Sequence, residues 1–145
     1  MIRHGQLADV SSLATLAQKL WPKHTVDTLE KEIQEAITKP NVAFFLAFTE
    51  NQPIAFAQCQ LRHDYVEGTS SSPVGYLEGI YVRQRYRQQG IASELLTACQ
   101  TWAKHNYCTE FASDCEIENM ESLKFHLSHG FIEANRLICF SKQLT

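Results

Sequence analysis

The chain has 145 residues, of which 44% are hydrophobic and 20% charged, a size and composition typical of one globular domain with a substantial core. Thirteen lysines and arginines against sixteen aspartates and glutamates give a net charge of −3 without a basic stripe, so nucleic acid is not an expected partner. Neither a signal-peptide core nor an apolar run of membrane-spanning length is visible, so we expect a cytoplasmic protein without a membrane partner.

The five cysteines are widely spaced and form no Cys-x-x-Cys pair. An odd, scattered set is typical of reduced thiols that pack as small hydrophobic residues in a cytoplasmic protein. A catalytic thiol is the alternative, and Cys115 is the candidate for it because it follows Asp114. The other four are Cys59, Cys99, Cys108 and Cys139.

Two helices and a hairpin are predicted in the first half of the chain. Asp9 can cap the first helix, which Pro22 ends, and Thr25 can cap the second. Val42–Phe48 and Ile54–Leu61 are rich in β-branched and aromatic residues and are separated by a turn sequence, which predicts a β-hairpin. The apolar positions on one face are Leu13, Leu16, Ala17 and Leu20 in the first helix and Val26, Leu29, Ile33 and Ile37 in the second.

Strands alternate with helices in the second half. Alternation implies parallel pairing with helices on both faces of the sheet, whereas the hairpin implies antiparallel pairing. The fold class is therefore α/β with a mixed central sheet. The predicted elements are a strand over Val74–Val82, a helix to about Asn106, a strand over Glu110–Cys115, a helix from Asn119 or Ser122 to Gly130, and strands over Phe131–Ile132 and Leu137–Leu144.

A glycine-containing loop, Arg87-Gln88-Gln89-Gly90-Ile91-Ala92, joins the Val74–Val82 strand to the following helix. The first N–H groups of a helix have no partner within it, and the helix dipole favours an anion there. Gly90 has no Cβ, so the backbone can approach a ligand closely. With a basic cluster at Arg83, Arg85 and Arg87, the loop predicts a phosphate site, and an ordinary surface turn is the alternative.

Longer segments are more specific than this loop. Tyr76-Leu77-Glu78-Gly79-Ile80-Tyr81-Val82, the glycine loop, and Asn119 through Gly130-Phe131 resemble the GNAT acetyltransferase superfamily, with a match over nearly the whole chain. More narrowly, Leu-Glu-Gly-Ile-Tyr-Val before Tyr-Arg-x-x-Gly-Ile-Ala, Thr109 to Asp114, and Leu20-Trp21-Pro22 are similar to aminoglycoside 6′-N-acetyltransferases. The resemblance implies one GNAT domain over residues 1–145 with splayed central strands, which transfers acetyl from acetyl-CoA to the 6′-amine of aminoglycoside antibiotics and so gives resistance.

For the cofactor, the resemblance implies that the backbone of Ile80 and Val82 pairs with the pantetheine arm, while an N–H near Ile80 polarises the thioester carbonyl. Gly79 is consistent with a bulge at this point, or it merely relieves crowding. Asn119 either hydrogen-bonds the CoA arm or caps its helix. The expected cofactor residues are Ile80, Tyr81, Val82, Arg87, Gln88, Gln89, Gly90, Ile91, Ala92 and Asn119, with no metal.

A cationic acceptor favours carboxylates and a flat aromatic surface. The resemblance implies that Glu78 and Asp114 contact the amines of the drug, and that Trp21 and Tyr65 shape its pocket. A core anchor at a helix end is the alternative for Trp21, and a loop cap is the alternative for Tyr65. Glu78 is the first candidate for the general base and Asp114 the second, and proton transfer to solvent without a dedicated base is a third possibility.

One position departs from the family. Many GNAT proteins carry tyrosine four residues before the Gly-Phe pair, where this chain has His126. A tyrosine general acid is therefore excluded, and His126 either replaces it or makes a polar packing contact. His126 and His129 form an i, i+3 pair, but two ligands alone do not predict a metal site.

Alternatives remain for the acceptor and for the assembly. The same fold acting on a polyamine, a peptide N-terminus or a protein lysine is the second hypothesis, and a non-catalytic acyl-CoA-binding module is the third. Leu137–Phe140 is strongly apolar for a terminal strand, and an exposed apolar edge has to be paired or covered. Together with the resemblance, this predicts a homodimer with the terminal strand at its interface, unless the strand fills its own sheet.

Overall fold

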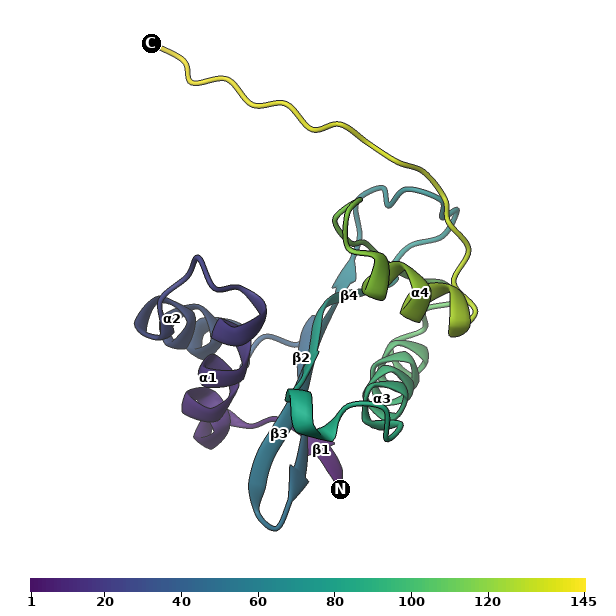
Figure 1. Ribbon diagram of the computed structural model, residues 1–145. Coiled ribbons are helices and arrows are strands. Elements are labelled where there is room, and N and C mark those ends of the chain that lie inside the picture. The colour runs from purple at the N-terminus through teal and green to yellow at the C-terminus, as the bar shows by residue number, and fades with distance from the viewer.

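The computed structural model describes residues 1–145 and contains five strands and four α-helices (Figure 1). The strands are β1 (Ile2–His4), β2 (Val42–Thr49), β3 (Gln52–Arg62), β4 (Val74–Val82) and β5 (Phe111–Ser113). The helices are α1 (Val10–Leu20), α2 (Val26–Ala36), α3 (Ile91–His105) and α4 (Met120–Ser128). Two 3₁₀ turns, η1 (Leu7–Asp9) and η2 (Gln84–Tyr86), precede α1 and α3. No helix is both long enough and apolar enough to cross a membrane.

The sheet is mixed, as the sequence predicts. Its strand order is β1-β2-β3-β4-β5, with antiparallel pairs among the first four strands and a parallel pair between β4 and β5. Helices α1 and α2 cover one face of the sheet and α3 covers the other (Figure 1).

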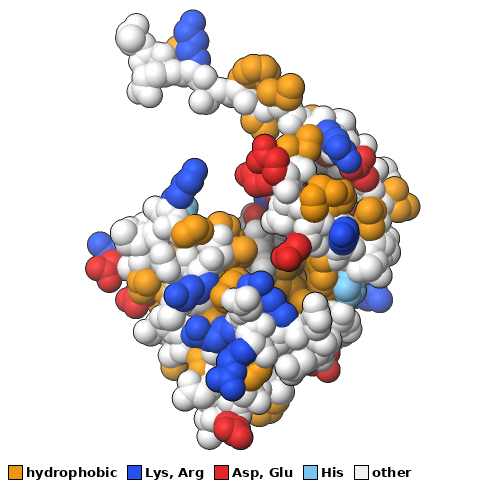
Figure 2. Space-filling model, viewed as in Figure 1, with side chains coloured by type: hydrophobic (Ala, Val, Ile, Leu, Met, Phe, Trp, Pro, Cys, Tyr) orange, Lys and Arg blue, Asp and Glu red, His pale blue; other side chains and the backbone are white.

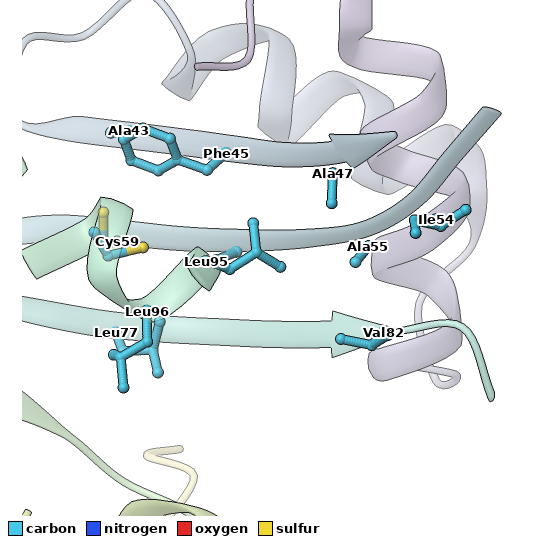
Figure 3. Packing of buried hydrophobic residues seen from close by; sticks show 12 residues of the cluster. Ala43, Phe45, Ala47, Ile54, Ala55, Cys59, Leu77, Val82, Leu95 and Leu96 are labelled. Atoms are coloured by element: carbon cyan, nitrogen blue, oxygen red, sulfur yellow. The ribbon is translucent and has the colours of Figure 1, made fainter. Parts of the chain in front are cut away.

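Each face of the sheet has its own hydrophobic cluster because side chains alternate along the strands. Phe45 of β2 belongs to the cluster that includes Leu95 and Leu96 of α3 (Figure 3). Its neighbour Phe44 belongs to the opposite cluster, together with Leu16 of α1. Burying one such side chain stabilises the fold by about 1.5–3 kcal/mol. The two clusters hold the central strands between two helical layers.

Strand β4 carries a bulge at Glu78. Leu77 lies opposite Cys59 and Gly79 lies opposite Gln58, so Glu78 has no partner residue on β3. On its other side, β4 pairs with β5 only over residues 75–77. The edge of β4 from Glu78 onward therefore has no strand beside it, which confirms the splayed central strands that the sequence predicts.

Helix capping agrees with the sequence at Thr25 and differs at Asp9. Thr25 Oγ1 accepts a hydrogen bond from the Thr28 N–H at 3.1 Å. The carboxylate of Asp9 makes no such cap. It instead binds the Arg3 guanidinium at 2.7 Å and accepts from the Gln6 N–H at 2.8 Å, so the prediction that its side chain caps α1 is wrong. Asp9 is the third residue of η1, and its carboxylate bonds back to the Gln6 N–H as in a capping box, so it closes the turn before α1 instead.

The chain after α4 differs most from the predicted structure. No strand forms over Phe131–Ile132 or Leu137–Leu144, and β5 is shorter than Glu110–Cys115. Figure 1 shows this segment leaving the body of the protein as an extended tail. Phe131 packs against Phe111, and the Asn135 amide donates to Glu67 of the β3–β4 loop at 2.9 Å. Beyond that point the apolar side chains are exposed, namely Leu137 (68%), Ile138 (83%), Phe140 (90%) and Leu144 (85%). The predicted strands are absent because no neighbouring strand within the chain pairs with them.

Candidate active site

A cleft of about 1130 Å³ opens where β4 and β5 separate. Its walls are the free edge of β4, the start of α3, one side of α4, and the segment that follows α1. Figure 2 shows the molecule hollowed between the α1–α2 side and the α4 side. All of the predicted site residues line this cleft except Tyr65 and Gln89. Tyr65 is 77% exposed on the β3–β4 loop, so its role in the acceptor pocket stays a prediction without support from this geometry.

The glycine loop has the geometry that an anion site needs. Gly90 is the N-cap of α3 with φ +83°, and no side chain caps the helix. A Cβ at Gly90 would meet no atom within 4 Å, so glycine is required here for its left-handed backbone and not to relieve crowding. Gln88 is also left-handed, with φ +62°. The first N–H groups of α3 have no side-chain cap, and the residues that carry them line the cleft.

Arg87 is fixed beside this loop. Its Nε donates to the Val82 carbonyl at 2.8 Å, and its guanidinium lies 5.5 Å from the centroid of the Tyr81 ring. These contacts leave the Nη groups of Arg87 without a hydrogen-bond acceptor in the protein, at the wall of the cleft. A guanidinium held in this way is suited to a phosphate oxygen.

Glu78 is not a free carboxylate, because Arg62 at the end of β3 binds both of its oxygens. Arg62 Nη2 lies 3.0 Å from Oε1 and 2.9 Å from Oε2, and Nε lies 3.2 Å from Oε2. The Glu78 side chain is 20% exposed and that of Arg62 is 38% exposed. With both oxygens bound to one guanidinium, Glu78 has fewer lone pairs open to an incoming amine than a carboxylate without a partner.

Asp114 has one partner and one free oxygen. The Tyr76 hydroxyl donates to Asp114 Oδ2, whereas Oδ1 accepts no hydrogen bond from the protein. Burial of the phenol and its hydrogen bond to Asp114 raise the pKa of Tyr76, so the hydroxyl remains a proton donor at neutral pH. Asp114 follows directly after β5, at the carboxyl end of the one parallel strand pair.

Trp21 forms part of the cleft wall and also packs in the core. Its ring meets Phe56 edge-on at a centroid distance of 6.1 Å. A Cβ at Gly79 would lie 2.6 Å from the Trp21 indole. Gly79 therefore leaves space for Trp21 to pack against β4, and it lies next to the bulge at Glu78. Relief of crowding and a place beside a bulge are thus both supported for this glycine.

His126 of α4 and His129, which directly follows α4, each use both ring nitrogens in contacts within the protein. His126 Nδ1 lies 2.6 Å from the Ser122 carbonyl, and its Nε2 lies 2.8 Å from Ser113 Oγ of β5. His129 makes the equivalent bonds, to the Phe125 carbonyl at 2.7 Å and to Ser93 Oγ. With both ring nitrogens occupied, His126 fits the polar packing interpretation better than that of a general acid. No group of three or more histidine, cysteine, aspartate or glutamate side chains is placed to bind a metal ion.

Asn119 has a structural role as well as a place in the cleft wall. The Asn119 side chain caps α4 by accepting from the Ser122 N–H at 3.1 Å, and it also lines the cleft.

All five cysteines are free. Contact with Cys99 and burial raise the pKa of the Cys59 thiol, and burial raises that of Cys108, so both stay protonated. Cys115 is exposed and lines the cleft.

The sequence did not identify four polar residues that support this site. Arg62 binds the carboxylate of Glu78, and Tyr76 donates to that of Asp114. Ser113 contacts His126, and Ser93 contacts His129. These contacts join residues that lie 13 to 38 positions apart, and they depend on strand register and helix docking. The one available signal was Arg62 itself, the one charged residue of its strand.

Comparison with known proteins agrees with this geometry. A family model described as the acetyltransferase (GNAT) family matches residues 9–131. The chain belongs to the GNAT acetyltransferase family. The predicted fold and the prediction of an acetyl-CoA-dependent N-acetyltransferase are thereby confirmed for this GNAT protein.

Similar proteins are named as aminoglycoside N-acetyltransferases. An aminoglycoside N(6′)-acetyltransferase type 1 of Salmonella typhimurium strain LT2 is 41% identical over 128 residues, which are 88% of this GNAT chain and 88% of the relative. The structure of aminoglycoside N-acetyltransferase AAC(6′)-Iy in complex with CoA has a TM-score of 0.95 at 38% identity, covering 99% of this chain and 95% of that one. The same enzyme with a bisubstrate analogue, CoA-S-monomethyl-acetylneamine, has a TM-score of 0.94 at 38% identity and coverages of 99% and 98%.

Proposed function

We propose that this protein, as one catalytic domain over residues 1–145, is an aminoglycoside 6′-N-acetyltransferase that uses acetyl-CoA. The main support for the proposal is one cleft that has a wall suited to a cofactor and a wall suited to a cationic acceptor. The free edge of β4 and the uncapped start of α3 suit a pantetheine chain and its diphosphate. The Asp114 side suits a cation. The relatives named for this activity, and the one bound to a bisubstrate analogue, support the choice of acceptor.

The cofactor side follows from the backbone. A thioester arm laid along Ile80 and Val82 would pair with β4 where β5 leaves it free. An N–H near Ile80 would then face the thioester carbonyl and stabilise the oxyanion. The diphosphate would receive the first N–H groups of α3 and the Arg87 guanidinium.

On the acceptor side, the 6′-ammonium must first lose a proton. Asp114 Oδ1 is better placed to accept this proton than Glu78, because Arg62 binds both oxygens of Glu78. The neutral amine nitrogen attacks the thioester carbonyl carbon, a C–N bond forms, and the C–S bond breaks. The ammonium group loses two protons in total, of which one ends on the CoA sulfur and the other in solvent.

Mass spectrometry tests this proposal directly. Tobramycin incubated with the protein and acetyl-CoA is expected to gain one acetyl group at its 6′ amine. Acetylation of spermidine or of a peptide amine with tobramycin left unmodified would instead support a GNAT enzyme with another acceptor. Acetyl-CoA binding without transfer to any of them would support a non-catalytic module.

We also propose that the protein acts in the cytoplasm and gives resistance to the drugs it acetylates. Five free cysteines, three of them buried, fit a reducing compartment. Expression in a susceptible bacterium is expected to raise the inhibitory concentration of tobramycin, whereas the Asp114→Asn variant raises it less. An equal rise with both proteins would contradict the assignment of Asp114.

A homodimer formed through the C-terminal tail is the last part of the proposal. Four apolar side chains of the tail are exposed, and β5 is an edge strand with one neighbour. Pairing of the tail with a second copy would bury these side chains and satisfy the edge. Light scattering is expected to give a dimer mass at micromolar concentration, and Phe140→Asp is expected to give a folded monomer. A monomer that persists at high concentration in the unaltered protein would contradict this part.

A further inference from the structure

Two side chains outside the cleft each hold one of its carboxylates. Arg62 and Tyr76 do not line the cleft, but Arg62 binds both oxygens of Glu78, and the Tyr76 hydroxyl donates to Asp114. The Arg62 guanidinium also lies 3.5 Å from the centroid of the Tyr76 ring, which is a cation–π contact. The four side chains form one continuous network from the end of β3, across β4, to the residue after β5.

The network anchors an exposed carboxylate to the centre of the sheet. Asp114 lies on an exposed segment after a strand of three residues. Tyr76 is 7% exposed on β4, where it pairs with Gln60 of β3 and Ala112 of β5. Its hydroxyl therefore fixes the Asp114 carboxylate from a position that cannot move independently of the sheet. Oδ1 of this cleft-lining residue has no hydrogen-bond donor in the protein.

The network also determines where negative charge remains. Arg62 carries one positive charge, and Glu78 and Asp114 carry one negative charge each, so the network has a net charge of about −1 at neutral pH. Because Arg62 binds Glu78 through both oxygens, the uncompensated charge lies at Asp114. A cationic amine that enters the cleft thus meets one defined site of attraction rather than two equivalent ones.

We propose that Arg62 and Tyr76 are positioning residues for the acceptor, Tyr76 by orienting Asp114 and Arg62 by neutralising Glu78 and packing on the Tyr76 ring. This inference rests on the proposed function, since the amines of the acceptor are what the carboxylates would bind. Neither residue lines the cleft in which the acceptor would bind. Each acts through its carboxylate, so its effect must disappear when that carboxylate is changed.

A double-variant cycle between Tyr76 and Asp114 tests the first half of the proposal. Tyr76→Phe removes one oxygen atom and keeps the ring on which Arg62 rests. We expect it to lower kcat/KM for tobramycin about tenfold, the usual effect of losing a hydrogen bond to a charged group, and to leave KM for acetyl-CoA unchanged. In an Asp114→Asn background the same change is expected to alter kcat/KM by less than about twofold.

The matched control is Tyr107→Phe. Tyr107 is 89% exposed just after α3, outside the cleft, and its loss of a phenol oxygen is expected to change neither constant. Effects of Tyr76→Phe and Asp114→Asn that simply multiply would overturn the role of Tyr76. So would a Tyr76→Phe variant with unaltered kinetics, or one whose acetyl-CoA and tobramycin constants change together.

A second cycle tests Arg62 against Glu78. Arg62→Gln is expected to lower kcat/KM for tobramycin, and Arg62→Lys to recover part of the loss because it keeps the charge without the planar fork. In a Glu78→Gln background, Arg62→Gln is expected to have a smaller effect. Equal losses in both backgrounds would overturn the role of Arg62. Should an Arg62 variant fail to fold, the Tyr76 cycle still decides the proposal, because its variants keep the packing.

Failure of this inference can be separated from failure of the proposed function. An unaltered protein that transfers no acetyl group to tobramycin would overturn the proposed function and the inference with it. An active protein with independent effects at the paired positions would overturn the inference alone.

Discussion

Replacing Gly90 by glutamate tests whether the start of α3 binds the diphosphate of acetyl-CoA. The variant changes two things, backbone conformation and charge. Gly90 has φ +83°, so any residue with a Cβ loses about 1–2 kcal/mol of stability there, although the Cβ itself meets no atom within 4 Å. The carboxylate would add a negative charge beside the expected diphosphate.

The size of the electrostatic effect follows from Coulomb's law. Two unit charges about 4 Å apart interact with roughly 1 kcal/mol in water and roughly 4 kcal/mol near a protein surface. Gly90 is exposed, so the lower end applies. We therefore expect Kd for acetyl-CoA to rise about fivefold or more, and the rise to shrink in high salt, where the charges are screened.

The chain offers a matched control at Gly130. Its φ is +86°, and a Cβ there also meets no atom within 4 Å, but it lies beyond α4 and does not line the cleft. Gly130→Glu is thus expected to lower Tm by a similar few degrees and to leave acetyl-CoA affinity unchanged. Gly90→Gln separates the two causes further, because it has the same backbone strain as the glutamate without its charge.

Isothermal titration calorimetry with acetyl-CoA, at low and high salt, measures all four proteins. We expect Gly90→Glu to bind acetyl-CoA more weakly than Gly90→Gln, and this difference in affinity to fall as the salt concentration rises. Equal affinities for Gly90→Glu and Gly130→Glu, in folded proteins, would refute the assignment of the loop to the diphosphate.

Three further predictions concern the acceptor wall and acid stability. Glu78→Gln and Asp114→Asn are each expected to lower kcat/KM for tobramycin about tenfold or more, while calorimetry gives unchanged Kd for acetyl-CoA. Gly79→Ala brings a Cβ to 2.6 Å from the Trp21 indole, so it is expected to displace that ring, shift Trp fluorescence and raise KM for tobramycin. The hydrogen bond and charge of Arg3 lower the pKa of Asp9. The ionised carboxylate therefore makes its full contribution to the free energy of unfolding above about pH 4, and this contribution is lost as the pH falls through the folded pKa. Denaturation is then expected to separate Asp9→Asn from the unaltered protein more widely at pH 7 than at pH 3.

Local patterns were sufficient for the elements that form from local interactions. The Thr25 cap, the hairpin of β2 and β3, and the helix after the glycine loop each depend on neighbouring residues, and the structure has all three. The Asp9 cap was wrong because partners outside the capping pattern, Arg3 and the Gln6 N–H, bind the same carboxylate. The terminal strands were wrong for a related reason, since the alternation over Leu137–Leu144 describes a strand only where another strand pairs with it.

The candidate site was predictable in its outline and not in its connections. A resemblance supplied the positions of Glu78 and Asp114, and the structure places both at one cleft. Their partners depend on register, because Arg62 reaches Glu78 only through the way that β3 and β4 pair. The serine partners of His126 and His129 also depend on how the helices pack against the sheet, so local sequence could not predict them.

The bulge in β4 explains how one strand serves the core and the cleft together. Leu77 belongs to the cluster on the α3 face, and so do Ile80 and Val82, whereas Tyr81 packs on the opposite face. Strict alternation from Leu77 would have placed Gly79 and Tyr81 on the α3 face and removed Ile80 and Val82 from it. One extra residue, Glu78, shifts the alternation of side chains by one position, and it has no partner on β3. The parity change between position 77 and positions 80 and 82 in the packing is therefore evidence for the bulge that is independent of any glycine.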